Sequence, residues 1–130
     1  MFSNNKLALG NYKCKVNEKI IQIQIWDACG NQEFAAKTPY FFNNTFLAII
    51  VYAINDRNSF NDINKWYNIL RYRSSPLIYI IGNKNDLEEK RQVPKHEAEK
   101  LVKNYKYIHF KLKLNIKIKK LNLKIELSVS

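Results

Sequence analysis

The hydrophobic pattern of the chain changes period several times, and each change predicts an element. In residues 12–25, apolar and polar residues alternate on either side of a polar turn at 17–19. Alternation around a short polar turn is typical of a β-hairpin with one solvated face. Continuous runs of β-branched and aromatic residues follow at 46–54, 77–81 and 107–110. Such runs predict strands that are buried on both faces.

The segments between these runs have a helical period. Apolar residues recur at three and four residues from Phe60 to Leu70, which predicts an amphipathic helix of about four turns. Asn58 or Ser59 is placed to cap it. Pro94 suits the first turn of a second helix. The apolar face of that helix consists of Ala98, Leu101, Val102 and Tyr105. Strands that alternate with helices predict an α/β fold with a parallel sheet, and the leading hairpin is its antiparallel edge.

Residues 111–130 do not continue this alternation of strands and helices. Apolar and polar residues alternate there with one extra residue at 119–120, which predicts a bulged or kinked strand. The segment carries six lysines and one glutamate, whereas residues 1–110 carry 16 basic and 10 acidic residues. We therefore divide the chain into a domain, 1–110, and a basic strand-like tail, 111–130.

The net charge of +11 and the sequence pI near 9.7 raise the question of a nucleic-acid partner. The tail holds nearly half of this excess but contains no aromatic residue and no arginine, so it offers neither stacking nor bidentate base contacts. We expect no nucleic-acid partner. No apolar run approaches the roughly 18 residues of a membrane span, and we expect a cytoplasmic protein with two free thiols, Cys14 and Cys29.

Two polar segments, 26–33 and 82–86, directly follow predicted strands, where ligands bind in this class of sheet. The second contains an Asn-Lys-x-Asp sequence that can recognise guanine. The Asp86 carboxylate would accept from adjacent N–H groups of the base, Asn83 would hydrogen-bond nearby, and the Lys84 stem would pack on the base face. By themselves, these four residues are better explained by an ordinary polar turn.

Taken together, the two segments resemble the Ras superfamily of small GTPases, most closely its Rab branch. Gly-Asn-Lys-Asn-Asp-Leu at 82–87 is similar to the guanine-specificity motif of the family. Residues 24–32 are similar to the Rab run in which a strand ends in Trp-Asp and passes through a glycine into the second switch. The resemblance spans roughly residues 9–110. It implies an incomplete Ras-like G domain of the P-loop NTPase type, with the first strand and the last helix missing.

The resemblance also implies roles for individual residues. Asn83, Lys84 and Asp86 would read the guanine of GTP or GDP. Asp27 would orient a water bound to Mg²⁺, and the Gly30 N–H would meet the γ-phosphate. A further pair of aromatic residues, Trp26 and Phe41, belongs either to the surface that Rab proteins present to effectors or to the packing of the hairpin.

Several positions depart from the family pattern. A phosphate-binding loop needs Gly-x-x-x-x-Gly-Lys-Ser/Thr, yet no two of the three glycines are five residues apart. Ala8 occupies the position of the switch threonine that ligates Mg²⁺, and Asn31 that of the catalytic glutamine. We therefore expect impaired GTP hydrolysis, because catalysis in this family is almost entirely positioning and electrostatics. In the family, the missing first strand lies centrally in the sheet, so we hypothesise that the tail strand fills an edge left there.

The function implied by the resemblance is a GTP-binding switch in vesicle traffic, with Rab effectors or regulators as partners. We expect a monomer that is cytoplasmic or peripheral on intracellular membranes, without a transmembrane segment or a C-terminal cysteine for prenylation. One alternative is a non-catalytic pseudo-GTPase that acts as an interaction module. Another is a fragment from an incomplete or frame-shifted gene model, in which case the flanking DNA would encode the phosphate-binding loop.

Overall fold

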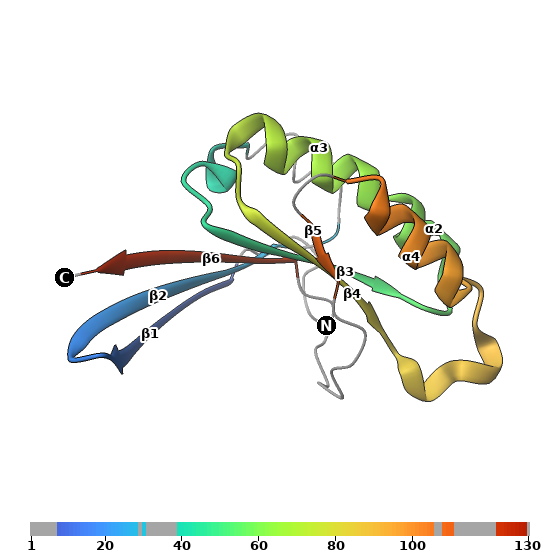
Figure 1. The fold of residues 1–130 in the computed structure, drawn as a ribbon, viewed down its shortest axis with the longest axis horizontal. Helices are drawn as coiled ribbons and strands as arrows, with labels where there is room; N and C mark the ends of the chain where they lie inside the picture. Colours follow the sequence, from blue (N-terminus) through green and yellow to red (C-terminus); the bar gives the residue numbers. More distant parts are fainter. Residues whose placement is uncertain (1–7, 29, 31–38, 106–107, 111–121, 130) are drawn as a thin grey trace.

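The computed structural model describes residues 8–28, 30, 39–105, 108–110 and 122–129. The strands are β1 (Ala8–Val16), β2 (Lys19–Ala28), β3 (Leu47–Ala53), β4 (Leu77–Asn83), β5 (Ile108–Phe110) and β6 (Asn122–Val129). The helices are α2 (Arg57–Asn61), α3 (Ile63–Arg73) and α4 (Lys95–Lys103), with 3-10 turns η1 (Pro39–Phe42) and η2 (Asn85–Lys90). The helices gather beside β3, β4 and β5, while the hairpin and β6 extend away from them (Figure 1).

One sheet with the strand order β1-β2-β6-β3-β4-β5 organises the molecule. Strands β3, β4 and β5 are parallel, and β1 and β2 form an antiparallel hairpin. This arrangement confirms the predicted α/β fold with a parallel sheet and an N-terminal antiparallel hairpin. The hairpin turn consists of Asn17 and Glu18, whose φ angles are 46° and 66°. Two consecutive positive φ angles give the turn a twist that matches that of the strands.

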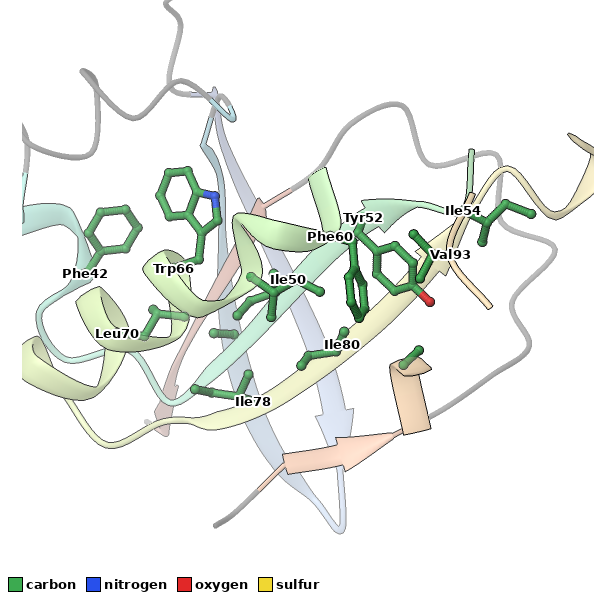
Figure 2. Close-up of a cluster of buried hydrophobic side chains, with 13 residues drawn as sticks. Phe42, Ile50, Tyr52, Ile54, Phe60, Trp66, Leu70, Ile78, Ile80 and Val93 are labelled. Atoms are coloured by element: carbon green, nitrogen blue, oxygen red, sulfur yellow. The ribbon is translucent and has the colours of Figure 1, made fainter. Parts of the chain in front are cut away.

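The core lies between the helices and one face of β3 and β4 (Figure 2). Residues along β3 alternate between buried and half-buried, with Ala48, Ile50 and Tyr52 on the buried face. The prediction that this run is buried on both faces was therefore wrong, because the other face of β3 is only half-buried. The buried face of β3 belongs to one core cluster with Phe60 of α2, with Ile63, Trp66 and Leu70 of α3, with Ile78 and Ile80 of β4, with Val93 and with Ala98 of α4.

The helical segment after β3 is divided at Asp62 into α2 and α3, where one continuous helix was expected. Its N-cap is Asp56, whose carboxylate accepts from the N–H groups of Asn58 at 3.0 Å and Ser59 at 3.3 Å. The predicted caps, Asn58 and Ser59, are therefore wrong by two or three positions. The Ser59 hydroxyl instead accepts from the Ala53 N–H at 2.9 Å, so it ties the helix start to the end of β3.

The tail strand β6 lies between β2 and β3 and is antiparallel to both. The hypothesis that the tail fills an edge of the sheet is confirmed for residues 122–129. The predicted bulge at 119–120 lies outside the described residues. Across the described ranges, no helix is long and apolar enough to cross a membrane.

Candidate functional site

The Asn-Lys-x-Asp sequence forms a sharp turn where β4 ends and η2 begins. Lys84 adopts a left-handed conformation, with φ 66° and ψ 38°. The Asn83 side-chain oxygen accepts from the Lys84 N–H at 2.8 Å, and the Leu87 N–H donates to the Lys84 carbonyl at 2.8 Å. Asn83 is half-buried, whereas Lys84 and Asp86 are exposed. One turn therefore brings together the three residues that were predicted to read guanine.

Gly82 lets β4 lie against the side chain of Tyr52 just before this turn. A Cβ atom at Gly82 would lie 2.8 Å from the Tyr52 hydroxyl oxygen and 3.0 Å from its Cζ. Tyr52 is buried against Phe60, with the two ring centroids 5.1 Å apart, so it has little room to move. Glycine is thus required here by close approach, and this explains why the motif begins with it.

Backbone hydrogen bonds hold the ends of β3 and β4 to the segment after η2. The Ile54 N–H donates to the Asn83 carbonyl at 3.0 Å. The Ile54 carbonyl in turn accepts from Gln92 at 2.9 Å and from Val93 at 3.0 Å. The turn is consequently anchored on its β4 side and on its η2 side by the same residue.

Arg91 fixes the far end of η2. Its guanidinium donates two hydrogen bonds to the Glu88 carboxylate, at 2.8 and 2.6 Å, and a third to the Val93 carbonyl at 2.9 Å. The hydrogen bond from Arg91 lowers the pKa of the Glu88 carboxyl below its ordinary value. Sequence reasoning missed this contact, although charges three residues apart were a signal for it.

Arg57 at the start of α2 makes a second connection to the same region. It donates to the Glu97 carboxylate at 2.5 Å and, through another guanidinium nitrogen, to the Gln92 carbonyl at 2.6 Å. The hydrogen bond from Arg57 lowers the pKa of Glu97. No sequence signal could have found this pair, because 40 residues separate its members.

Asp27 and Gly30, predicted to face Mg²⁺ and the γ-phosphate, lie at the end of β2. Asp27 is half-buried, and burial raises the pKa of its carboxyl above the ordinary value. Ala8, which occupies the family's threonine position, pairs directly with Asp27 across the hairpin. Gly30 is exposed, and a Cβ there would meet no atom of the described residues within 4 Å. Asn31, at the family's glutamine position, and Cys29 lie outside the described residues.

The structure does not bring Asp27 next to the guanine-type turn. Asp27 and Ile49 both pair with Leu123 of β6, so they lie level across the sheet. Asn83 pairs with Ala53, which is four residues further along β3. At about 3.3 Å per residue and about 4.8 Å per strand, the offset is about 13 Å along the sheet and about 14 Å across it. The two predicted halves of the site are therefore about 20 Å apart.

The residues present fit a magnesium ion only in part. Mg²⁺ prefers octahedral oxygen ligands and usually keeps several waters, so a single carboxylate acting through water is compatible with Asp27. Ala8 brings no side-chain oxygen to the same position. Across the part of the chain that the structure describes, no cluster of three or more His, Cys, Asp or Glu side chains could hold a metal.

The aromatic pair Trp26 and Phe41 joins β2 to η1. Their ring centroids are 5.5 Å apart with the planes at 43°, and both residues are half-buried. Of the two roles that the sequence left open for this pair, packing against the hairpin is thus present in the structure. Tyr40, next to Phe41, is 77% exposed.

An α/β sheet that is parallel at β3, β4 and β5, with an antiparallel leading hairpin and an Asn-Lys-Asn-Asp turn at the carboxyl end of β4, is typical of an incomplete Ras-like G domain. The model of the Ras family matches residues 6–126. The chain is 35% identical over 98 residues to Ras-related protein Rab-11B of Dictyostelium discoideum and 36% identical over 92 residues to Ras-related protein RABA6b of Arabidopsis thaliana. The chain belongs to the Ras family and is similar to its Rab branch.

These alignments cover 74% and 69% of this chain but only 44% and 40% of the two relatives. The chain therefore spans less than half the length of the curated relatives it matches. The family match continues past residue 110, where the motifs end, and includes part of β6.

Proposed function

We propose that this chain is a Rab-like module that recognises the guanine base of GTP or GDP and turns the nucleotide over poorly. The observation that carries the proposal is the anchored turn at 83–86, with Asn83 half-buried and Lys84 and Asp86 exposed to a ligand. In this turn Asp86 accepts from the base, Asn83 hydrogen-bonds nearby, and the Lys84 stem covers the base face.

The phosphate side of the proposed site is weaker than the base side. The 130 residues contain no Gly-x-x-x-x-Gly-Lys loop, and Ala8, beside Asp27, has no hydroxyl to ligate Mg²⁺. Burial also raises the pKa of Asp27, which makes its charged form less favourable. When bound, Mg²⁺ would supply charge neutralisation at the phosphates. We therefore expect base contacts to dominate affinity, so that binding is weak and changes less than twofold when Mg²⁺ is removed with a chelator.

The test compares equilibrium binding of guanosine, GDP, GTP and ATP to the 130-residue chain by calorimetry. Asp86→Ala should weaken guanosine and GTP binding by about 10-fold or more, since a hydrogen bond to a charged group contributes about 1.5–3 kcal/mol. Glu89→Ala is the matched control, because Glu89 is an exposed acid in the same turn η2. Equal affinity for GTP and ATP, or equal effects of the two variants, would sink the proposal. Phosphate release should stay at the buffer rate.

We extend the proposal to partners and location. Rab effectors or regulators would contact the half-buried Trp26 and Phe41 and the exposed Tyr40 beside them. The chain would act as a monomer in dilute solution, either in the cytoplasm or at the surface of intracellular membranes. Co-sedimentation with vesicles of acidic lipids, repeated at high salt, tests the membrane part, because electrostatic attachment through lysines weakens with ionic strength.

A further inference from the structure

The middle of the sheet is closed by the last strand of the chain. All eight residues of β6 pair with β2, from Ile21 with Val129 to Ala28 with Asn122. On its other side, β6 pairs with only three residues of β3, Leu47 to Ile49. We call the space between these two edges the central slot, bounded by residues 21–28 of β2 and 47–49 of β3. Strand β6 is therefore paired along its whole length with β2, but with less than half of β3.

The connection from β5 to β6 is long for the distance it spans. Phe110 pairs with Ile80, and Ile80 pairs with Ile50, so these residues form one row across the parallel strands. Leu123 pairs with Ile49, which places the preceding residue, Asn122, in the same row. Three strand spacings separate the two points, which is about 14 Å. The eleven intervening residues, 111–121, can reach up to about 36 Å. The covalent link therefore does not force β6 into the central slot of its own chain.

We propose that the central slot is a strand-binding site that accepts β6 from a second copy of this chain as well as from its own. The second copy offers the same strand in the same register, so the contacts inside the slot are identical. Only the connection changes. The covalent link gives the chain's own strand an effective concentration in the millimolar range. Self-occupancy therefore dominates in dilute solution, and exchange between copies becomes comparable near about 1 mM.

Loss of β6 from the central slot also provides a reason for exchange. When β6 leaves, β2 and β3 expose two rows of unpaired N–H and C=O groups in the middle of the sheet. Open edges of this kind readily pair with another strand. The most suitable strand nearby is the released β6 of another copy, and reciprocal exchange yields a closed two-fold dimer.

The first experiment tests whether β6 occupies the slot in its own chain. In the 130-residue chain with Cys14 and Cys29 replaced by serine, the double variant Ile23→Cys/Leu127→Cys joins a directly paired position. On mild oxidation at micromolar concentration it should form an intramolecular disulfide in most molecules. The control Ile21→Cys/Leu127→Cys is displaced by two residues, about 7 Å along the strand, and should cross-link at least fivefold less. Equal cross-linking of the two variants, or none, overturns the assignment of the slot.

The second experiment tests exchange. Two single variants, Ile23→Cys and Leu127→Cys, are mixed at about 1 mM in the same serine background, oxidised, and separated by size without reductant. A covalent dimer should form at least fivefold more than in the mixture of Ile21→Cys with Leu127→Cys, and its yield should fall on tenfold dilution. Equal yields in the two mixtures mean random collision, and absence of dimer means that the slot is closed to a second copy. Either result overturns the proposal. Circular dichroism of each single variant verifies that it is folded.

Discussion

Replacement of Gly82 by alanine should destabilise the protein through one defined contact. The new Cβ would lie 2.8 Å from the Tyr52 hydroxyl oxygen, 3.0 Å from its Cζ and 3.3 Å from a methyl carbon of Ile54. Both neighbours are fully buried, at 2% and 0% exposure, so the structure must shift around the added methyl group. Such overpacking costs about 1–3 kcal/mol. Alanine also lowers the conformational entropy of the unfolded chain, which stabilises the folded protein by about 0.4–1 kcal/mol and offsets part of this cost. We expect a net loss of about 1–2 kcal/mol in the free energy of unfolding.

Urea denaturation followed by tryptophan fluorescence measures this loss, because Trp66 lies in the core. For a slope of about 2 kcal/mol/M, the midpoint should fall by about 0.5–1 M. Gly30→Ala is the matched control. Gly30 is exposed, and its added Cβ meets no described residue within 4 Å, so the midpoint of this variant should change by less than about 0.3 M.

The origin of the loss is tested with Tyr52→Phe, which removes the atom closest to the new methyl group. Adding Tyr52→Phe to Gly82→Ala should recover at least about 0.5 kcal/mol relative to the sum of the single changes, as expected for residues in contact. The affinity of the variants for guanosine should rank in the same order as their stability, because the displaced segment leads into the turn at 83–86. Strict additivity, or an equal effect of alanine at Gly30, would refute the reasoning.

Three further predictions concern the core, the helix start and pH. Ile80→Ala should cost about 2–5 kcal/mol in thermal or urea unfolding, because Ile80 is 1% exposed within the core; a cost below about 1 kcal/mol would contradict its placement. Asp56→Ala should cost about 1 kcal/mol through loss of the cap on α2, and Asp56→Asn, which keeps the acceptor, should cost less in the same assay. The lowered pKa of Glu88 contributes stability above the carboxyl's ordinary pKa of 4.5, and this contribution is lost as the pH falls through the lowered value. Glu88→Gln should therefore flatten the acid limb of the stability curve, and an unchanged limb would show that the pair with Arg91 is not made.

The hairpin and the guanine-type turn could be predicted from sequence because their determinants are local. Alternation on both sides of Asn17 and Glu18 fixes the hairpin, and four consecutive residues form the turn at 83–86. The N-cap at Asp56 was missed because Asn58 and Ser59 are equally good capping residues by type. Only the path of the backbone decides which of the three precedes the first helical turn.

The sequence by itself determined the family, the order of the strands and helices along the chain, and the residues of the guanine-type turn at 83–86. All of these depend on residue type and short spacing. The tertiary structure decided three other matters. It set Asp27 about 20 Å from that turn, it joined the start of α2 to Gln92 and Glu97 through Arg57, and it placed β6 between β2 and β3. These features depend on pairings between segments far apart in the chain. A strand pattern specifies which residues alternate, but the partner and direction of a strand are chosen only when the edges of the sheet compete for it.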